Sequence, residues 1–335
     1  MVQSKFKLSN LEYETLIDYV FQDVASAGLL DVTANHTVTW LKDKLRALKA
    51  IDPENILFYL DTGNTFHIPT YYNFEVPLDN PDLYRDYFVK HCMAEVSVIG
   101  VSGASSKRPK APAFLFLSPL ESKWKSLQSV IPNMLQMSVV GYPFVNPGAV
   151  GGVGEYIDQK EGNIHKSSAT STDEDIELYI RWYQLNTFMP MLHFLKPPTA
   201  FPEPKMEKII PKLKRIREDI LPKLIEFSTE AMKSSKPVIR PLWMLDSDDP
   251  VNHVIDDQFM IGDEVLVAPI LQYQQRERDI YLPKIPNAKS QMENAWRGSD
   301  GKVYSGGNWL NNTVVTLEEV PYFVRCDPIK CLPFV

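Results

Sequence analysis

The chain has 335 residues, of which 44% are hydrophobic, and a formal net charge of −7. A chain of this length buries a substantial core and is long enough for two domains. The mild acidity and the lack of a basic stripe argue against binding to nucleic acid. No window reaches the length of a membrane span, and residues 1–10 lack the apolar core of a signal peptide.

Alternating helix and strand patterns run through the first two hundred residues. The helical patterns cover residues 11–27, 31–48, 83–93, 127–137 and 176–188, and Thr33 could cap the second of them. Short apolar runs predict strands at 56–61, 95–101, 113–117, 138–145 and 189–195. Strands that alternate with helices in this way form a parallel sheet with crossover helices.

The pattern changes after residue 236. Residues 205–234 predict a long helix that Pro211 and Pro222 interrupt. Beyond it, short strand-like runs between turn residues cover 238–244, 259–270, 278–282, 313–317 and 322–325. The sequence therefore predicts an α/β domain over residues 1–236 and an all-β sandwich over residues 237–335.

Cysteine usage points to no metal site. The three cysteines, Cys92, Cys326 and Cys331, lack metal-ligand spacing and are too few for a disulfide framework. Cys326 and Cys331 could pair locally in an oxidising compartment, and two free thiols are an equal alternative. N-x-[ST] sequons at Asn35 and Asn311 fit a secretory route, although such triplets often arise by chance. We expect neither a metal nor a cofactor.

Asp61 is the first candidate for chemistry. It ends the apolar run 56–61 and is followed by Thr62, Gly63 and Asn64. In α/β barrels the carboxyl ends of strands carry the catalytic groups, so Asp61 could be a nucleophile, a base or a metal ligand. It could equally cap the next helix. Strand position alone leaves both interpretations open.

Three blocks of sequence carry a resemblance to a known family. They are residues 177–190 (ELYIRWYQLNTFMP), 237–243 (PVIRPLW) and 255–269 (IDDQFMIGDEVLVAP). In order and spacing they resemble the C-terminal half of glycoside hydrolase family 31, the retaining α-glycosidases, and residues 139–144 (VVGYPF) match the family's seventh barrel strand. The tract 58–63 (FYLDTG) is closest to one branch of this family. Together the matches extend over residues 28–325.

The resemblance implies a fold and a reaction. Residues 1–236 would be the C-terminal part of a (β/α)8 TIM barrel, about strands 4–8, and the sandwich would follow. The implied activity is hydrolysis of O-glycosyl bonds in α-glucosides or α-galactosides, so the implied ligand is a carbohydrate. Retaining hydrolysis uses a carboxylate nucleophile and a second carboxylic acid roughly 5–5.5 Å away. By resemblance, Asp61 is the nucleophile at the end of the fourth strand.

Position 148 departs from the family's pattern. By resemblance the acid/base aspartate follows a proline after the seventh strand, and here Gly148 follows Pro147. Glu155 and Asp158 are the nearest acids, in the loop beyond. The acid/base position is therefore lost, which implies a weakened or inactive glycosidase. The alternative is a catalytically dead relative that keeps the fold as a carbohydrate-binding or protein-interaction scaffold.

Further residues are candidates for substrate binding by resemblance. Trp124 matches the family, and the transition-state-stabilising arginine eight residues before it maps to Phe116. The family's sugar-contacting histidine maps to Leu195, and His193 nearby could substitute, although a lone histidine on an apolar strand is more often structural. Asn64, three residues after the nucleophile position, completes the set.

The predicted barrel is incomplete. Only about sixty residues precede Asp61, with no convincing strand among them, whereas the family's nucleophile ends the fourth of eight strands. A half barrel would expose sheet edges and an apolar interior to water. We therefore expect an N-terminal segment or a partner chain to complete it. This chain does not define its own localisation; likeness to the family implies the secretory pathway or the lumenal side of a membrane for the full-length protein.

Overall fold

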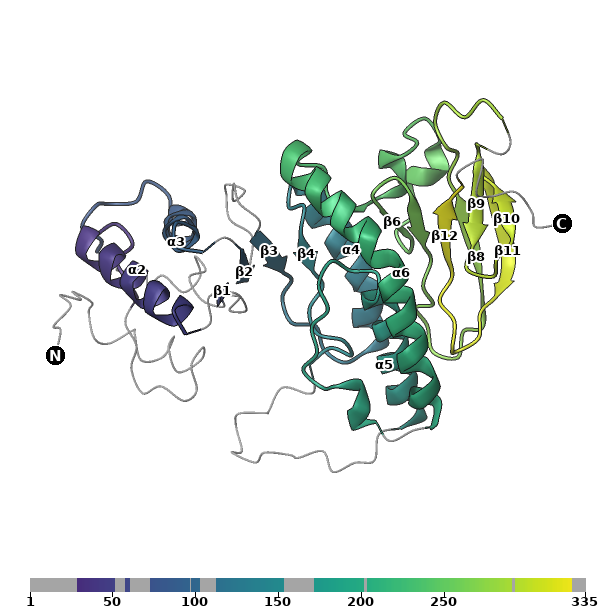
Figure 1. The fold of residues 1–335 in the computed structure, drawn as a ribbon, viewed down its shortest axis with the longest axis horizontal. Coiled ribbons are helices and arrows are strands. Elements are labelled where there is room, and N and C mark those ends of the chain that lie inside the picture. Colours follow the sequence, from purple (N-terminus) through teal and green to yellow (C-terminus); the bar gives the residue numbers. More distant parts are fainter. Residues whose placement is uncertain are drawn as a thin grey trace. The chain divides into compact units, whose positions relative to one another are not determined.

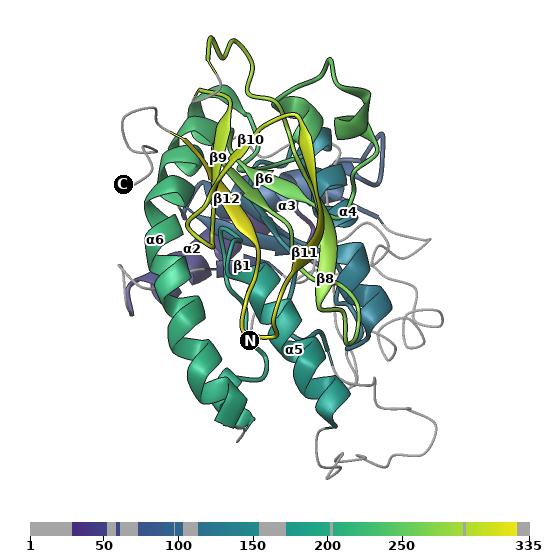
Figure 2. The ribbon, with the colours of Figure 1, turned by 90° about the vertical axis from the view of Figure 1, so that its right-hand side faces the viewer.

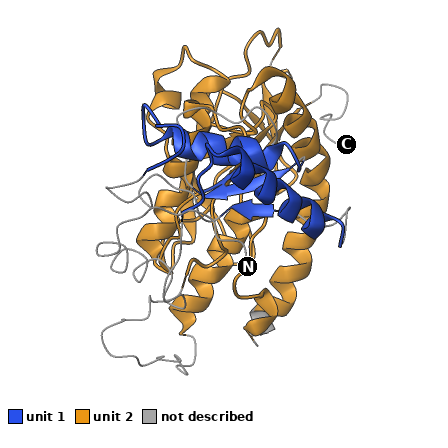
Figure 3. Cartoon of the chain, turned by 90° about the vertical axis from the view of Figure 1, so that its left-hand side faces the viewer, with its two compact units in different colours: residues 1–116 blue, residues 117–335 orange. Residues whose placement is uncertain are grey.

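The structure is a computed structural model of the whole chain. It describes residues 29–51, 58–60, 73–96, 98–102, 113–153, 172–201, 204–290 and 293–326. The chain forms two compact units, residues 1–116 and 117–335 (Figure 3). The predicted domain boundary at 236/237 falls inside unit 2 and stays a prediction. The predicted helix over 11–27 lies outside the described residues.

Unit 1 contains three parallel strands and two described helices. The strands β1 (Phe58–Leu60), β2 (Ile99–Ser102) and β3 (Ala113–Phe116) pair in that order. Ile99, Val101 and Leu115 are fully buried, as expected of apolar residues in a covered parallel sheet. The helices are α2 (Asn35–Lys49) and α3 (Leu83–Met93), and they contact each other. These elements confirm the predicted order of helices and strands.

The predicted cap of α2 is wrong. The N-cap position is Ala34, which has no side-chain cap. Thr33 instead donates both its N–H and its hydroxyl to Asp31 Oδ1, at 2.9 and 2.6 Å. The Asp31 carboxylate also accepts the N–H of Glu75 at 2.8 Å, so it closes the turn before the helix rather than the helix itself.

Unit 2 begins with the helices α4 (Trp124–Val140) and α5 (Asp173–Asn186), with the short strand β4 (Val145–Asn146) between them (Figure 1). The predicted strand at 138–145 is wrong over most of its length, because α4 continues to Val140. Gly141 ends α4 with a φ of +113°, a left-handed cap that glycine adopts without strain. A capping box formed by Thr172 and Asp175 starts α5.

The helix α6 (Pro204–Ser234) is continuous, although we predicted that two prolines would interrupt it. An internal proline costs about 3 kcal/mol. The compensation is a buried stripe at helical spacing along the whole helix: Met206, Ile209, Leu213, Ile216, Ile220, Leu224, Phe227 and Ala231. Packing of this stripe outweighs the local preference of the prolines.

The predicted final barrel strand at 189–195 is also wrong, since these residues are irregular. Arg217 of α6 occupies the carbonyl groups that a strand would pair. Its guanidinium donates to the carbonyl oxygens of Thr187 and Pro190, each at 3.0 Å, and to that of Met189. Side-chain donors therefore replace a strand partner here.

The C-terminal part of unit 2 is a sandwich of two antiparallel sheets (Figure 2). The larger sheet has the order β10-β9-β12-β7-β6-β5, and the smaller pairs β11 with β8. The strands are β5 (Ile239–Arg240), β6 (Phe259–Ile261), β7 (Val265–Val267), β8 (Glu277–Leu282), β9 (Ala295–Gly298), β10 (Val303–Ser305), β11 (Asn308–Val314) and β12 (Tyr322–Arg325). The short 3-10 helices η2 (Pro198–Ala200), η3 (Leu242–Met244) and η4 (Pro250–His253) complete unit 2. Both sheets contribute to one buried core, where Trp296 and Phe323 meet Ile280 and Leu282.

Several strand predictions in the sandwich need correction. The run predicted at 238–244 forms the strand β5 only at Ile239–Arg240 and then the 3-10 helix η3 at Leu242–Met244. Residues 259–270 form a hairpin of β6 and β7 rather than one strand, because Gly262 turns the chain with a φ of +54°. A Cβ atom there would lie 2.2 Å from the ring of Phe227, so only glycine fits. The strands β9 and β10 were not predicted, and β11 starts at Asn308, earlier than expected.

Candidate functional site

The strand β1 ends directly before the predicted nucleophile. The carbonyl of Leu60 accepts a hydrogen bond from the Ser102 hydroxyl at 3.3 Å, which ties the carboxyl ends of β1 and β2 together. The buried Arg85 of α3 donates to the carbonyl of Ser102 and brings a positive charge to this edge. Asp61 and Asn64 lie outside the described residues, so their predicted roles stay predictions.

Phe116, at the position expected for an arginine, packs as an aromatic residue. Its ring centroid lies 4.4 Å from that of Tyr59. Gly100, on the strand between them, makes this contact possible, because a Cβ atom there would lie 2.7 Å from the Phe116 ring and 3.0 Å from Tyr59. Position 116 therefore contributes an apolar surface and no charge.

Gly148 lies two residues after β4 in a tight turn. Asn146, which is fully buried, accepts the N–H of Gly148 on its Oδ1 at 2.8 Å. The side-chain amide of Asn186, at the end of α5, donates to the Gly148 carbonyl at 3.5 Å. Two buried amides thus hold the backbone of Gly148 from both sides.

The space beside Gly148 differs from that beside its neighbours. All three glycines of the segment, Gly148, Gly151 and Gly152, have positive φ angles. A Cβ atom at Gly151 would lie 2.5 Å from the Tyr179 ring, and one at Gly152 would lie 2.7 Å from the carbonyl oxygen of Leu120. A Cβ atom at Gly148 would meet no atom of the described residues within 4 Å. Close packing explains two of these glycines and leaves open space at the third.

The two amides that hold Gly148 each keep one unused polar atom. Among the described residues, Asn146 Nδ2 and Asn186 Oδ1 are buried without a hydrogen-bond partner. One is a donor and the other an acceptor, and a buried group of this kind costs about 1–3 kcal/mol when it stays unpaired. Both belong to side chains that form hydrogen bonds with the backbone of Gly148, the residue beside the open space.

His193 and Trp124 belong to segments that neighbour this turn. The N–H of Val150 donates to the carbonyl of His193 at 2.9 Å. The N–H of Val153 donates to the carbonyl of Leu120 at 2.8 Å, four residues before Trp124. The Trp124 ring lies 5.9 Å from that of Tyr273 in the sandwich, which indicates a packing role as well. Backbone hydrogen bonds therefore join residues 150–153 to the segments that contain His193 and Trp124, whereas Glu155 and Asp158 lie outside the described residues.

The block at 177–190 has a structural role that we did not predict. Arg181 is fully buried and donates to Gln184 Oε1 at 3.0 Å and to the carbonyls of Thr316 and Glu319 at 3.1 Å each. Burial lowers its pKa to about 10, so it remains charged at neutral pH. Glu177 forms a two-pronged ion pair with Arg276, at 2.5 and 2.9 Å. The spacing of Glu177, Arg181 and Gln184 on one helical face was the available signal.

These contacts join α5 to the sandwich. They explain why this block is recognisable without any catalytic residue in it. The other two blocks behave alike: Arg240 binds Asp263 and Glu230, each at 2.6 Å, and the side chain of Gln258 bonds both backbone groups of Tyr281. The blocks of Arg181 and Arg240 therefore join helices to the sandwich, and the block of Gln258 joins the two sheets of the sandwich.

No metal or membrane site emerges from the described part of the chain. Within it, no three side chains of His, Cys, Asp or Glu gather as metal ligands. No helix among the described residues combines the length and apolar character of a membrane span. Cys326 is disulfide-bonded and Cys92 is a buried free thiol, whereas Cys331 lies outside the described residues, so its pairing stays a prediction.

Two models of known protein families match this chain, one over its α/β part and one over its C-terminal β part. The model of the glycosyl hydrolases family 31 TIM-barrel domain matches residues 110–226, and that of the family's C-terminal domain matches residues 235–329. The chain belongs to glycoside hydrolase family 31. The predicted fold class is thereby confirmed: part of a family 31 TIM barrel, followed by the C-terminal β domain.

Two relatives and one solved structure are similar to this chain. It is 30% identical over 309 residues to the myogenesis-regulating glycosidase of Mus musculus, as the tract at 58–63 predicted, and 33% identical over 225 residues to the SITS-binding protein of Tetronarce californica. These matches cover 88% and 66% of this chain, but only 40% and 29% of the relatives. A family 31 α-xylosidase from a soil metagenome, complexed with xylose, matches with a TM-score of 0.67 and 22% identity, over 90% of this chain and 46% of that one.

Proposed function

We propose that this chain supplies the nucleophile of a retaining α-glycosidase site that acts on α-glucosides or α-galactosides and is weakened by the loss of its acid/base residue. The observation that carries the proposal is the position of Asp61, directly after the parallel strand β1, in a chain of family 31. The carboxyl ends of barrel strands are where such enzymes hold their catalytic groups. The xylose complex of the related α-xylosidase supports a sugar as ligand.

In the first step Asp61 attacks the anomeric carbon. A bond forms between its carboxylate oxygen and that carbon, while the bond to the leaving oxygen breaks and its electron pair departs with the leaving group. No carboxylic acid at position 148 protonates the leaving oxygen. General acid catalysis typically contributes about 10²–10⁴-fold, so only leaving groups that depart as stable anions escape this penalty.

In the second step a nucleophile releases the sugar from Asp61. Water needs a base to take its proton, and Gly148 provides none. A small anion such as azide needs no base, and the open space beside Gly148 gives it room. Attack on the face where the leaving group stood restores the α configuration and frees the Asp61 carboxylate.

The test uses the full chain with a graded series of leaving groups. We expect turnover with 2,4-dinitrophenyl α-glycosides of one configuration, gluco or galacto, and little with the methyl glycosides. Azide should accelerate turnover and yield the α-glycosyl azide, identified by NMR. The Asp61→Asn variant is the control and should form no azide product. Hydrolysis of methyl and dinitrophenyl glycosides at similar rates, or a β-glycosyl azide, would contradict the proposal.

The alternative function is a catalytically dead scaffold that binds carbohydrate or protein. The apolar contact of Phe116 with Tyr59 favours it, because the charge expected to stabilise the transition state is absent there. A folded chain that forms no azide product with either sugar, yet still binds oligosaccharide, would establish this alternative.

A further inference from the structure

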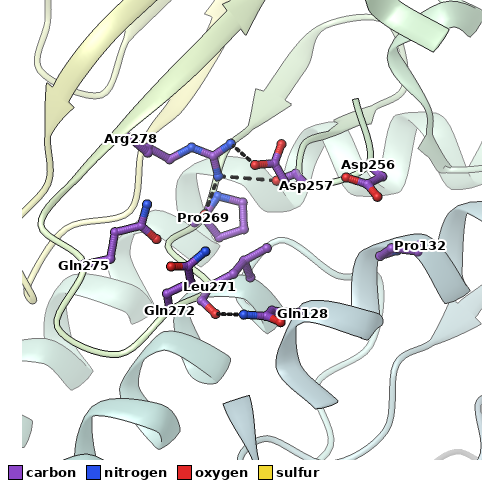
Figure 4. A pocket seen from close by; sticks show the side chains of 9 residues that line it. All are labelled: Gln128, Pro132, Asp256, Asp257, Pro269, Leu271, Gln272, Gln275 and Arg278. Atoms are coloured by element: carbon purple, nitrogen blue, oxygen red, sulfur yellow. Dashed lines mark hydrogen bonds and ion pairs between the residues drawn. The ribbon is translucent and has the colours of Figure 1, made fainter. Parts of the chain in front are cut away.

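Two adjacent cavities in unit 2 are lined by residues of the sandwich, and the first also by residues of α4. The first, of about 250 Å³, extends from Gln128 and Pro132 of α4 to Arg278 of β8 (Figure 4). The second, of about 460 Å³, extends from Arg278 to Trp309 of β11. Asp257, Gln275 and Arg278 line both, so the two cavities form one groove.

Arg278 forms the middle of this groove and is only 7% exposed. Its Nη2 donates to Asp257 Oδ2 at 2.8 Å and its Nη1 to the carbonyls of Pro269 and Asp257 (Figure 4). Its Nε donates to the carbonyl of Asp279 at 3.2 Å. A guanidinium has five N–H donors, and four contacts are made here. Within the described part of the chain, one N–H of Nη2 therefore has no partner.

Trp309 forms one end of the groove and is 47% exposed. It is held in place, because its ring lies 5.2 Å from that of the buried Tyr281, which in turn donates its hydroxyl to Asp249. A large aromatic ring that packs against the protein and keeps part of its surface exposed can stack against a ligand.

A bulge in β11 sets the polar groups beside this ring. The register with β8 shifts between Leu310 and Thr313, and Asn312 adopts a φ of +52°. The N–H of Asn312 donates to Asp279 Oδ1 at 2.8 Å, which fixes the bulge. Among the described residues the side-chain amide of Asn312 has no hydrogen-bond partner, and Asn312 lines the same cavity as Trp309. The bulge thus presents an amide and an indole together.

We propose that this groove is an accessory binding site for a neutral oligosaccharide. The C–H face of a sugar ring stacks on an aromatic ring such as Trp309. Sugar hydroxyl groups both donate and accept hydrogen bonds. Planar amide, carboxylate and guanidinium groups can bind two neighbouring hydroxyls, and Asn312, Asp257 and Arg278 supply these groups here. Two joined cavities give room for more than one sugar unit.

Four carboxylates, those of Asp256, Asp257, Glu277 and Asp279, and one guanidinium, that of Arg278, line the groove, so its charges disfavour an anionic ligand. Asp257 and Asp279 each use a carboxylate oxygen for Arg278 and for the backbone of Asn312. No cluster of metal ligands exists among the described residues, and these two aspartates belong to none. The site holds sugar independently of catalysis, so it does not rest on the activity proposed for Asp61.

The test measures binding of maltotriose and of raffinose to the full chain by saturation-transfer NMR. We expect binding of one of them, weakened about tenfold by Trp309→Ala. Asn312→Gly, which keeps the backbone conformation and removes the amide, should weaken it severalfold. The matched control is Trp40→Ala on α2, where the indole is 45% exposed, and it should leave binding unchanged.

Two further measurements separate this site from the catalytic one. Asp61→Asn should leave the Trp309-dependent binding unchanged, and Trp309→Ala should leave the azide product unchanged. The proposal would be overturned if the Trp309→Ala variant bound the sugar as well as the parent chain does, or if neither sugar bound. It would also be overturned if the groove bound the cation spermidine and neither sugar.

Discussion

Replacing Gly148 with aspartate should restore the acid/base function, if this position is the one that family 31 uses. The expected gain is about 10²–10⁴-fold in the rate for substrates with poor leaving groups, because these need a proton most. For dinitrophenyl glycosides the gain in the first step should be small, since the leaving group departs unaided. The measurement is the dependence of the rate on the pKa of the leaving group, which should flatten in the Gly148→Asp variant.

The structure also gives the stability that this substitution costs. A Cβ atom at Gly148 meets no atom of the described residues within 4 Å, so no steric clash with them is added, but the φ of +95° is unfavourable for a side chain. Such a conformation costs about 1–2 kcal/mol. For a unit of this size, 1 kcal/mol lowers Tm by about 2–4 °C, so we expect a loss of about 2–8 °C.

Three variants separate strain from chemistry. Gly148→Asn carries the same strain and no acid, so it should lose the same stability and gain no rate. Gly301→Asp has a φ of +81° and open space in the sandwich, and it should also cost about 1–2 kcal/mol. Gly151→Asp should unfold the chain, because its Cβ would lie 2.5 Å from the Tyr179 ring. Equal rates for the Asp and Asn variants at position 148, or a stability loss as severe as at Gly151, would refute the reasoning.

Three other predictions concern stability and reactivity. Arg240→Met should cost about 3 kcal/mol in urea denaturation, because it leaves two carboxylates without their buried partner, whereas Lys302→Met at an exposed pair 3.6 Å long should cost under about 1 kcal/mol. Hydrogen bonds from Thr316 hold the pKa of Glu319 below its usual 4.5. The stabilisation by Glu319 is therefore complete above pH 4.5 and is lost as the pH falls through the lowered pKa. The difference in unfolding free energy between the parent and Glu319→Gln should shrink between pH 7 and pH 3. Burial raises the pKa of the Cys92 thiol to about 12, so iodoacetamide should alkylate it at pH 8 no faster than the chain unfolds, and rapid labelling of the native chain would contradict this.

The sequence predicted element types well where local signals and burial agree. The helix at 83–93 and the short strands of unit 1 follow from apolar spacing alone. It failed where distant contacts override local preference. The prolines of α6 are tolerated because a buried stripe runs the whole length of that helix. Residues 189–195 are irregular, and Arg217 binds the carbonyls of Met189 and Pro190 at the start of this segment.

Some features of the candidate site could be predicted from the sequence and others could not. By resemblance, Gly148 and Phe116 stand where charged residues are expected in the family, and this stays a prediction. The open space beside Gly148 and the packing of Phe116 through Gly100 depend on neighbours far along the chain, so no local pattern carries them. The docking role of Arg181 is similar, because its acceptors are backbone carbonyls more than 130 residues away.

The most direct test of the account is covalent trapping of the nucleophile. The folded chain is incubated with 5-fluoro α-glycosyl fluorides of gluco and galacto configuration, and its intact mass is measured. Fluoride leaves without a proton, so the absence of an acid at position 148 cannot prevent the reaction. We predict one glycosyl adduct, mapped by peptide analysis to Asp61 and absent from the Asp61→Asn variant. A chain that melts cooperatively and forms no adduct with either sugar, or one labelled at another residue, would contradict it.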